Sequence, residues 1–470
     1  MEWLLTRFTS APDSVAFIHE GRRVTYGAVV AKIEIFRQRL DELGVRSGDA
    51  VVVIGDFSPE WYSLFISLGL TGTLIVPLSP DSVVEAEEAL GVSGCDWQIV
   101  FDVAGESFTC DRLHIDSSSP VLANFRASSR SGLVLFSSGS TGKPKGILHD
   151  FFRVAEKFRK QRKPVVAIPF LMVDHFGGIN TLLAITSSLG TVVTTSDRSV
   201  TGICRAVEEY CVELLPTTPS FLTLLTSSRV YQDYDLSSLK RITYGTEVMP
   251  QATLDRLHSA FPYADLLQTY GLSEVGVLHS QSRPDGSVWF RVGGDGFRTK
   301  VVDNVLWIKS DYAMVGYLNA PSEFDDEGWF NTKDQVEVDG DYIRILGRST
   351  DLINVGGQKV YPAEVESVVL EVDNIRDVAV YGERHSLLGQ IVVAKVLLDE
   401  PEPLDLVKRR IRHTALSRLA AYKVPARVVL AEGPLHSSRH KKIRKVAENS
   451  HGASYSVNRR WQCLGARHRQ

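Results

Sequence analysis

The stretch SSGSTGKPKG, at residues 137–146, directly follows the apolar run GLVLF at residues 132–136. It holds three glycines and four hydroxyl residues in ten positions. The backbone N–H groups of such a loop can approach an anion closely, and Ser and Thr hydroxyls donate further hydrogen bonds. Lys143 and Lys145 add positive charge, so the stretch predicts a phosphate-binding loop rather than a surface turn. It is not a Walker A loop, because Pro144 follows Lys143 and the required spacing is absent.

The sequence around this loop alternates between short apolar runs and amphipathic segments. Residues 26–43 predict a helix, because apolar side chains recur there at helical spacing, at Val29, Val30, Ile33, Phe36, Leu40 and Leu43. Strands are expected at residues 50–54, 73–76, 132–136, 164–168 and 191–194. The alternation predicts an α/β fold, with a large N-terminal domain whose sheets are mostly parallel. After about Phe290 the sequence becomes strand-rich, with runs at 335–338 and 342–346, and a small α+β unit is expected after Gly347.

Composition and charge narrow the class of protein. The chain has 470 residues, a length that favours two to three domains. Apolar residues at 44% and charged residues at 23% exclude collagen, a long coiled coil and wholesale disorder. The formal net charge of -4 gives no signature of a nucleic-acid binder. Residues 408–470 nevertheless carry 16 Lys and Arg against 2 Asp and Glu. This basic end suits a polyphosphate, a phosphorylated cofactor or an acidic partner protein, or it is a solvated basic face.

Cysteine usage and apolar runs favour a cytoplasmic protein. The five cysteines form no CxxC pair and no Cys/His cluster with zinc spacing, which favours a reducing compartment. The start MEWLLTRFTS has only a three-residue apolar run, so we expect no signal peptide. Residues 61–80 are free of charge, but Gly69, Gly72 and Pro77 interrupt them. We expect a helix, a turn and a buried strand there, and no integral membrane segment.

Three further motifs follow the loop along the chain. YGTEVMP occupies residues 244–250, QTYGLSE residues 268–274, and NTKDQVEVDGDYIRILGRSTD residues 331–351. With SSGSTGKPKG, these segments resemble, in order, the signature motifs of the adenylate-forming superfamily. That family groups acyl- and aryl-CoA synthetases, non-ribosomal adenylation domains and luciferase-like enzymes. QTYGLSE resembles the family's YGxTE segment, with Ser273 in place of the usual Thr. The resemblance covers about residues 10–447.

The resemblance implies a site for the phosphates of Mg-ATP. Ser273 contacts the α-phosphate region, and Glu274 holds Mg²⁺, since a carboxylate suits a hard cation that bridges phosphates. The glycine-rich loop grips the β- and γ-phosphates, through Ser137, Ser138, Gly139, Ser140, Thr141, Gly142 and Lys145.

The same resemblance implies how the nucleoside is held. Tyr270 stacks on the adenine, because an aromatic face suits a purine. Backbone at Gly245 and Thr246 lines the adenine pocket. Asp334 and Arg348 hold the ribose hydroxyls, a role for a carboxylate that other nucleotide sites share. Without the other motifs, Asp334 and Arg348 would equally well be a charged strand end.

In the family the chain pivots just after this arginine. The resemblance therefore implies an N-terminal AMP-binding domain at residues 1–347, a hinge at 348–350, a small mobile C-terminal domain at 351–450 and a basic tail at 451–470. Thr350 stands at the hinge position, where Asp or Lys is usual. Gly356 and Gly357 resemble the segment that lets a thiol-bearing arm approach. The following PAEVE, at residues 362–366, predicts a helix N-terminus, with Pro in the first turn and acids that favour the helix dipole.

SSRHKKIRK, at residues 437–445, resembles the family's SGKIxR motif. Alignment on Ile443 puts Lys442 at the catalytic lysine, which bridges the carboxylate substrate and the α-phosphate during adenylation. A lysine suits this role because its mobile point charge can follow developing negative charge. His440 and Lys441 replace the usual Ser-Gly, so Lys441 competes for the role, and a solvated basic run is the alternative.

LMVDHFGGINTLL, at residues 171–183, resembles the segment that forms the gate and one wall of the acid pocket. His175 would be the gating residue, although a lone histidine is often structural. Asp174 raises the alternative of an amino-acid substrate, because relatives that activate amino acids place an Asp nearby for the ammonium group. Alignment on His175 puts Phe176 at that position, which argues against an amino acid.

The resemblance implies an AMP-forming acid–thiol ligase with ATP and Mg²⁺ as cofactors. A small carboxylic acid would react with ATP to give acyl-AMP and pyrophosphate, mainly through positioning and charge stabilisation. The small domain would then rotate about Thr350 for transfer to the thiol of CoA. Alternatives are transfer to the phosphopantetheine of an acidic carrier protein, transfer to an amine, or a non-catalytic relative that only binds nucleotide.

Overall fold

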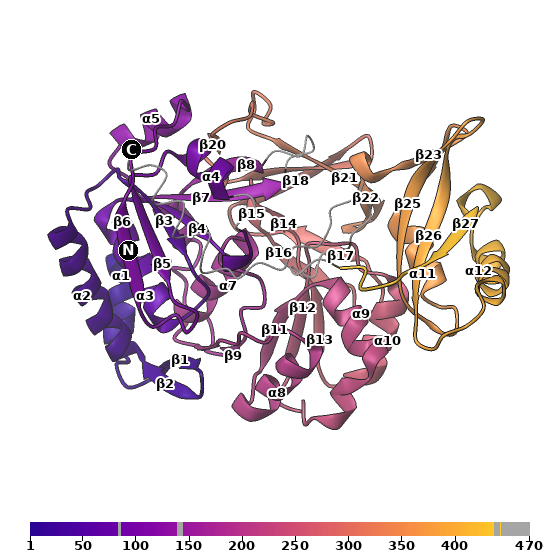
Figure 1. Cartoon of the computed structure of the whole chain (residues 1–470), viewed down its shortest axis with the longest axis horizontal. Coiled ribbons are helices and arrows are strands. Elements are labelled where there is room, and N and C mark those ends of the chain that lie inside the picture. Colours follow the sequence, from indigo (N-terminus) through magenta and orange to yellow (C-terminus); the bar gives the residue numbers. More distant parts are fainter. Residues whose placement is uncertain (83–85, 139–143, 437–441, 443–470) are drawn as a thin grey trace.

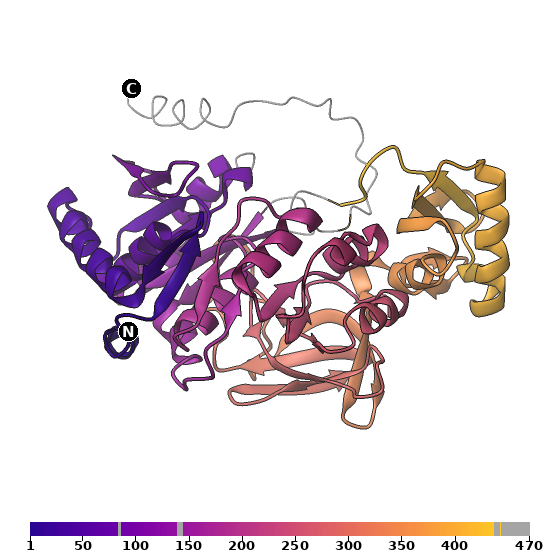
Figure 2. The same cartoon turned by 90° about the horizontal axis from the view of Figure 1, so that it is seen from below.

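The computed structural model describes residues 1–82, 86–138, 144–436 and 442. A large α/β part and a small α+β part at one end give an elongated molecule, as Figures 1 and 2 show. The expected α/β fold class is confirmed, and the fold is described best by its sheets.

The first sheet of the large part has seven strands: β1 (Val15–His19), β2 (Arg22–Thr25), β9 (Val166–Ala167), β10 (Thr191–Val193), β11 (Leu214–Thr217), β12 (Arg241–Tyr244) and β13 (Asp265–Gln268). They lie in the order β13-β12-β11-β9-β10-β1-β2, and only β1 and β2 pair antiparallel. One face shares a core with α8 (Val200–Tyr210), α9 (Pro219–Ser228) and α10 (Gln251–Ala260).

The second sheet also has seven strands: β3 (Ala50–Ile54), β4 (Leu74–Leu78), β5 (Trp97–Phe101), β6 (Phe108–Arg112), β7 (Gly132–Ser138), β8 (Pro144–Asp150) and β20 (Gly316–Tyr317). Their order is β20-β8-β7-β4-β3-β5-β6, with parallel pairing from β7 to β5 and antiparallel pairing at both edges. Alternate side chains of β3 face two cores, because successive residues of a strand point to opposite faces.

Helices fill the space between these two sheets and cover the outer face of the second. A shared core joins both sheets to α1 (Glu2–Thr9), α2 (Tyr26–Leu43), α3 (Pro59–Thr71), α6 (Phe151–Glu156) and α7 (Phe176–Thr186). The outer face is covered by α4 (Ala86–Ser93) and α5 (Pro120–Ala127). The large part is therefore layered, with each sheet between apolar helix faces (Figure 1).

The local expectations for α2, α3 and β4 are confirmed. Thr25 caps α2 by accepting the N–H of Ala28, and Gly44 ends it at a φ of 85°. Residues 61–80 form most of α3, a glycine turn and β4. The strand expected at 164–168 shrinks to β9, since Pro164 has no N–H to donate. In the part of the chain that the structure describes, no helix is long and apolar enough to cross a membrane.

The third sheet is antiparallel throughout, as the strand-rich pattern after Phe290 indicates. Its strands are β16 (His279–Ser282), β17 (Phe290–Gly293), β18 (Phe297–Val302), β19 (Val305–Ser310), β21 (Phe330–Asp339) and β22 (Tyr342–Arg348). The order is β16-β17-β22-β21-β19-β18. A separate hairpin of β14 (Gly271–Leu272) and β15 (Gly276–Val277) lies between β13 and this sheet in the sequence.

The small part begins after β22, at the turn Ser349–Asp351. Its elements are β23 (Ile353–Val355), β24 (Gln358–Val360), α11 (Pro362–Val369), β25 (Ile375–His385), β26 (Gly389–Leu398), α12 (Leu404–Arg418) and β27 (Arg427–Leu430). The sheet order is β24-β23-β26-β25, and β27 adds to β26. The expected helix start is confirmed, because α11 begins at Pro362.

Among the described residues, two hydrogen bonds join the small part to helices of the large part. The Ser227 hydroxyl donates to the carbonyl of Arg376 at 3.3 Å, and the Arg256 guanidinium donates to the carbonyl of Leu370 at 2.6 Å. Ala252 of α10 also belongs to the apolar core of the small part. The two parts are thus packed together through α9 and α10.

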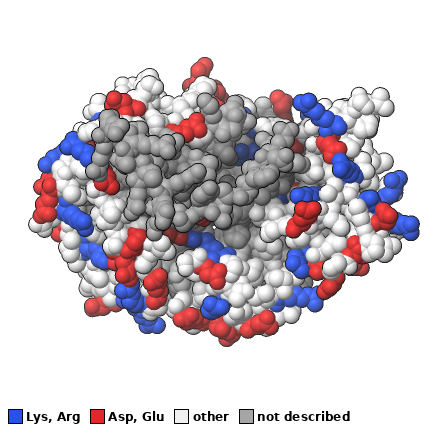
Figure 3. All heavy atoms as spheres, viewed as in Figure 1, with Lys and Arg blue, Asp and Glu red and all other residues white. Residues whose placement is uncertain are grey.

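The basic character of the C-terminal end is balanced locally in the described residues. On α12, Lys408 pairs with Asp405, and Arg418 pairs with Glu371 of the neighbouring segment. Figure 3 shows Lys and Arg side chains gathered at the small-part end, with acidic side chains among them. The tail at residues 451–470 lies outside the described residues.

Candidate active site

A tyrosine, an aspartate and an arginine meet where β13 leads toward the third sheet. The hydroxyl of Tyr270 donates to Oδ2 of Asp334 at 2.5 Å. Nε of Arg348 lies 3.4 Å from Oδ1 of the same carboxylate, and β21 and β22 place the two residues opposite each other. The N–H of Asp334 donates to the Thr332 hydroxyl at 3.1 Å, which fixes the base of the side chain. Three residues predicted from distant motifs therefore form one cluster.

Burial sets the protonation of this cluster. It raises the pKa of Asp334, although Arg348 and the Tyr270 hydroxyl act in the opposite direction. It also raises the pKa of Tyr270 well above the usual value, and Asp334 adds to this, so the hydroxyl remains a donor. Burial acts to lower the pKa of Arg348, but Asp334, Tyr270, Glu274 and Asp351 together outweigh it and raise that pKa. A carboxylate has about four acceptor sites, so Asp334 can still accept further hydroxyls.

Gly245 and Thr246 lie beside this cluster, at the end of β12. A Cβ at Gly245 would come within 2.5 Å of the Thr269 hydroxyl, so only glycine allows this close approach. Thr269, the residue before Tyr270, donates its N–H to the carbonyl of Tyr244 at 2.7 Å. Thr246 has a φ of 71°, which is rare for a β-branched residue and is frequent at ligand sites. The structure thus brings the predicted adenine segment next to Tyr270.

Glu274 lies in the turn between β14 and β15. A Cβ at Gly271 would meet the carbonyl of Gly276 at 2.6 Å, so the hairpin closes only with glycine there. The hydroxyl of Tyr317 donates to Oε1 of Glu274 at 2.8 Å. Burial raises the pKa of Tyr317, and the Glu274 carboxylate raises it further, so the donor keeps its proton. Tyr317 therefore orients the carboxylate that the resemblance assigns to Mg²⁺.

Ser273 is held through its main chain by a buried histidine. Nε2 of His149 lies 2.7 Å from the Ser273 carbonyl, so it carries the proton and donates. Burial lowers the pKa of His149 to about 4, which keeps the ring neutral. The ring also lies 4.9 Å from that of Phe176 at the start of α7. His149 therefore links the predicted α-phosphate residue to the predicted acid-pocket wall.

The base of the phosphate-binding loop is an antiparallel pair of strands. Ser137 pairs with Lys145, and Ser138 pairs with Pro144. The Lys145 ammonium lies 2.9 Å from Oε1 of Glu323 and 4.8 Å from the centre of the Tyr317 ring. Gly139, Ser140, Thr141 and Gly142 lie outside the described residues.

Asn319 and Glu323 support the same base from the chain after β20. The Asn319 amide donates to the carbonyl of Pro144 at 2.9 Å and accepts the N–H of Gly146 at 2.9 Å. The other oxygen of Glu323 lies 2.9 Å from the ammonium of Lys333, so the carboxylate bridges two lysines. Lys145, Tyr317 and Glu274 are connected in turn by a cation–π contact and a hydrogen bond.

His175 and Asp174, from the predicted acid-pocket segment, both have structural roles. His175 caps α7, and its Nδ1 accepts the N–H of Gly177 at 3.0 Å. Oδ2 of Asp174 accepts hydrogen bonds from the hydroxyls of Ser79 and Ser82, the first at 2.8 Å. Asp174 thus ties the segment that follows β4 to the start of α7.

Lys442 lies at the boundary between the two parts. Its N–H donates to Oε1 of Glu247 at 2.9 Å, and Glu247 directly follows Thr246. Its ammonium lies 3.3 Å from Oδ1 of Asp377 in β25. The main chain is therefore next to the adenine segment, whereas the charged end is turned into the small part. Lys441, the competing residue, lies outside the described residues.

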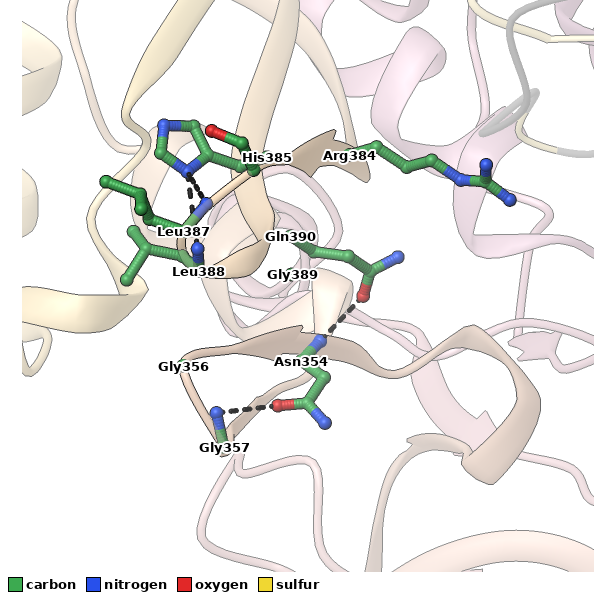
Figure 4. A pocket seen from close by; sticks show the side chains of 10 residues that line it. Asn354, Gly356, Gly357, Arg384, His385, Leu387, Leu388, Gly389 and Gln390 are labelled. Atoms are coloured by element: carbon green, nitrogen blue, oxygen red, sulfur yellow. Dashed lines mark hydrogen bonds between the residues drawn. The ribbon is translucent and has the colours of Figure 1, made fainter.

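Gly356 and Gly357 form the turn between β23 and β24, away from the nucleotide residues. They line an open crevice of about 760 Å³ with the β25–β26 hairpin tip, including Leu388 and Gln390 (Figure 4). The N–H of Gly356 donates to the carbonyl of Leu388 at 2.9 Å. Thr350 lies in the turn Ser349–Asp351, where its hydroxyl approaches Asp351 at 3.3 Å. The structure does not bring these glycines together with Tyr270 and Asp334.

Sequence reasoning missed several residues that support the predicted ones: Tyr317, Asn319, Glu323, Glu247, Asp377 and His149. One weak signal existed, because Tyr317 and Asn319 alternate along GYLN and so share a face. Their partners in the loop and in the β14–β15 turn are fixed only by tertiary pairing, such as that of β20 with β8.

Comparison with known proteins agrees with this geometry. The AMP-binding enzyme family model matches residues 5–318, and its C-terminal domain model matches residues 364–442. The chain therefore belongs to the AMP-binding enzyme family, and the expected superfamily is confirmed.

Among curated relatives, the long-chain-fatty-acid–CoA ligase FadD13 of Mycobacterium tuberculosis is 25% identical, over 96% of this chain and 98% of that protein. Acyl-CoA synthetase 7 of Caenorhabditis elegans is 31% identical, over 61% of this chain and 59% of that protein. The 4-coumarate:CoA ligase 1 of Petunia hybrida is 25% identical, over 86% of this chain and 85% of that protein. These relatives agree with the expected activity, ATP-dependent adenylation of an acid and its ligation to CoA by an AMP-forming acid–thiol ligase.

Solved structures agree with the fold. The anthranilate CoA ligase AuaEII in complex with anthranoyl-AMP has a TM-score of 0.79 at 19% identity, covering 94% of this chain and 95% of that chain. ATP-bound MatB from Rhodopseudomonas palustris has a TM-score of 0.76 at 22% identity, covering 93% of this chain and 96% of that chain.

Proposed function

We propose that this protein activates a small carboxylic acid with ATP, releases pyrophosphate, and transfers the acyl group from acyl-AMP to the thiol of CoA. The observation that supports this proposal most directly is the cluster of Tyr270, Asp334 and Arg348 beside Gly245 and Thr246. Residues from separate motifs lie together there, and their side chains are suited to binding a nucleoside. The family of AMP-binding enzymes supports the same activity.

In this proposal the nucleoside lies along the close-packed backbone at Gly245, with its adenine on Tyr270. The ribose hydroxyls donate to Asp334, whose carboxylate is fixed by Arg348. Lys145 and the hydroxyls of the glycine-rich loop bind the β- and γ-phosphates. Lys442 places its ammonium between the acid carboxylate and the α-phosphate, where it stabilises the charge that develops during attack.

Mg²⁺ suits the residues that surround Glu274. In the described ranges, no group of three or more His, Cys, Asp or Glu side chains could hold a metal ion. Mg²⁺ is usually held by one or two carboxylates together with substrate phosphates, so a single oriented carboxylate fits it. When bound with ATP, the ion neutralises phosphate charge. Tyr317 holds the Glu274 carboxylate in place.

We propose the expected division into domains for the second half of the reaction. The domain at 1–347 binds Mg-ATP, the domain at 351–450 turns about the hinge at 348–350, and Thr350 is the pivot. The turn withdraws Lys442 and brings Gly356 and Gly357 toward the adenylate, where their missing side chains leave room for the thiol arm. His175 gates the acid pocket from the start of α7.

The state of the cysteines supports a cytoplasmic location. Four of them lie in the described part of the chain, and all four are free thiols: Cys95, Cys110, Cys204 and Cys211. Free thiols are typical of reducing compartments.

The test is acid-dependent pyrophosphate release by the purified full chain with Mg-ATP and a panel of aryl and aliphatic acids. We expect release only with both ATP and an acid, and an acyl-AMP mass in the quenched reaction. Lys442→Ala should lower the adenylation rate at least about 100-fold. Lys408→Ala, on α12, is the matched control. ATP binding without pyrophosphate release for every acid would contradict the proposal and favour a non-catalytic nucleotide binder.

The acceptor is tested on the adenylate formed in that reaction. CoA, an acidic carrier protein with its phosphopantetheine arm, and an amine are supplied separately, and the product masses are compared. A CoA thioester as the main product supports the proposal. A loaded carrier protein or an amide as the main product would replace CoA by that acceptor.

A further inference from the structure

Three polar side chains are buried together at the inner edge of the small part. The side chain of Asp377 is fully buried, and those of His436 and Lys442 are 4% and 7% exposed. The Lys442 ammonium lies 3.3 Å from Oδ1 of Asp377, and Nε2 of His436 lies 3.4 Å from Oδ2. A buried charge is costly unless an opposite charge accompanies it. The Asp377 carboxylate therefore makes this position of the ammonium possible.

The carboxylate is held rigidly by its strand. Asp377 lies in β25, opposite Leu397 of β26, and its Oδ1 also accepts the N–H of Val378 at 2.8 Å. His436 and Lys442 are bridge partners in an antiparallel arrangement, so the lysine is anchored beside the histidine. Asp377 thus offers a fixed anion to the ammonium of a lysine, which sits at the end of a flexible four-carbon stem.

The main chain of Lys442 is held on the opposite side, by the large part. Its N–H donates to Glu247, which in turn accepts hydrogen bonds from the N–H and hydroxyl of Ser220. Glu247 follows Thr246 of the proposed adenine segment. With its main chain fixed there, the side chain has two destinations: Asp377, where it lies here, and the reacting carboxylate and α-phosphate of the proposed function.

Acidic side chains from both parts of the molecule act on the cluster of Asp377, His436 and Lys442. Asp377 comes from β25, and Glu366 of α11 accepts the N–H of Val380 at 2.9 Å within the same core. Glu247 comes from the large part. Burial lowers the pKa of His436, although Asp377 acts against this, so the imidazole adds no positive charge at neutral pH. The nearest of these groups to the ammonium is the Asp377 carboxylate.

We propose that Asp377 is a positioning residue that stores the ammonium of Lys442 when the lysine is not engaged at the acyl phosphate. The inference rests on the proposed function, which gives Lys442 its role in adenylation. Storage withdraws the cation by a turn of the side chain alone, before the domain turn moves the main chain, so it competes with adenylation and favours the thiol-transfer half of the reaction. The pair consequently sets the ratio of the two half-reaction rates.

The first test compares the two half-reactions in Asp377→Asn, which keeps an acceptor for the Val378 N–H. Adenylation is measured as acid-dependent ATP–pyrophosphate exchange, and transfer as thioester formation from supplied acyl-AMP and CoA. We expect the ratio of adenylation to transfer to rise about tenfold over that of the parent protein. Glu364→Gln, which removes the carboxylate that pairs with Lys423 in the same domain, is the matched control and should leave the ratio unchanged. An equal loss of both half-reactions in Asp377→Asn would overturn storage.

The second test is a double-mutant cycle read by thermal unfolding of the full chain. It compares the parent protein with Asp377→Asn, Lys442→Met and the double variant. We expect Asp377→Asn to destabilise the protein strongly and the added Lys442→Met to restore much of the loss, because removal of both partners leaves no unpaired charge. If Asp377→Asn alone fails to fold, recovery in the double variant still supports the pair. Additive effects would overturn it.

The two proposals fail in distinguishable ways. Loss of pyrophosphate exchange in Lys442→Met together with an additive cycle would leave the proposed function standing and overturn the storage of Lys442. Retained exchange in Lys442→Met would leave adenylation standing but overturn the role of Lys442 in it and therefore the storage, because a lysine that plays no part in adenylation needs no storage. Absence of acid-dependent exchange in the parent protein would overturn the proposed function itself.

Discussion

The hydroxyl of Tyr317 donates a 2.8 Å hydrogen bond to Oε1 of Glu274. The two residues come from different elements, β20 and the β14–β15 turn, so the bond fixes one carboxylate oxygen relative to the loop base. Outer partners of a metal-holding carboxylate commonly change metal affinity or activity by about 10- to 100-fold when they are removed. This relationship gives the first prediction.

Tyr317→Phe should lower kcat/KM for adenylation by about tenfold and raise the Mg²⁺ concentration needed for half-maximal rate. The ring remains, so the cation–π contact with Lys145 is kept and only the hydroxyl is lost. Pyrophosphate release across a Mg²⁺ titration measures both effects. Tyr263→Phe, whose hydroxyl donates to the Leu236 carbonyl near the surface, is the control. An unchanged Mg²⁺ requirement would contradict the role of Tyr317.

Asp334→Asn should raise KM for ATP by about tenfold with little change in kcat, because it weakens binding that ground and transition states share. An amide also loses the ionic contact with Arg348 and takes a poorer hydrogen bond from Tyr270. Initial rates over an ATP series at saturating acid measure the split. Asp339→Asn, at the far end of β21 where Asp339 pairs with Arg283, should leave KM unchanged. If the two variants had the same KM for ATP, the assignment of Asp334 to the ribose hydroxyls would be wrong.

His149 should make the folded protein sensitive to acid. The unfolded chain binds a proton with a pKa of about 6.5, whereas burial lowers the pKa of His149 to about 4 in the folded protein. As pH falls, the unfolded chain is protonated first, so stability is complete above about pH 6.5 and declines toward pH 4. This amounts to about 3 kcal/mol across that window.

Denaturant unfolding at pH 7 and pH 5 measures this effect. His149→Gln, which keeps a donor for the Ser273 carbonyl, should show a smaller loss of stability between the two pH values than the parent protein. His413→Gln, at an exposed position of α12, should lose as much as the parent. An equal loss in all three proteins would refute the prediction.

His175 combines a cap with a proposed gate, and two variants separate them. His175→Asn keeps an N-cap acceptor, so its stability should match the parent, whereas His175→Ala should lose about 1 kcal/mol. Both remove the imidazole ring, and both should change KM for the acid several-fold if the ring gates the pocket. Thermal unfolding and acid titrations measure the two effects. An unaltered acid KM in both variants would leave His175 a cap alone.

Local patterns were sufficient for much of the fold. α2 begins and ends where its spacing predicts, because Thr25 and Gly44 supply both caps within the same stretch. The pairing of β21 with β22 also follows from two strand-like runs separated by a short turn, but a bulge between Gln335 and Val336 shifts the register and places Asp334 opposite Arg348. The caps and the hairpin depend on neighbours in sequence, whereas the bulge does not follow from the turn.

The supporting contacts could not be predicted in this way. Tyr317 meets Glu274 only because β20 adds to the edge of the second sheet beside β8. The pairing of Asp377 with Lys442 joins residues that are far apart in sequence, and no periodicity encodes it. The resemblance indicated that Lys442 reacts, but the structure alone indicates where its charge rests.

Three hydrogen bonds between the large and small parts share one arrangement. In the contacts of Ser227, Arg256 and Glu247, the large part contributes a side chain and the opposite partner is a main-chain carbonyl or N–H. Peptide groups are common to all residues other than proline, which lacks only the N–H. Most substitutions at Leu370, Arg376 and Lys442 therefore leave these hydrogen bonds intact, so the constraint on docking falls on Ser227, Arg256 and Glu247 and on the apolar contact of Ala252.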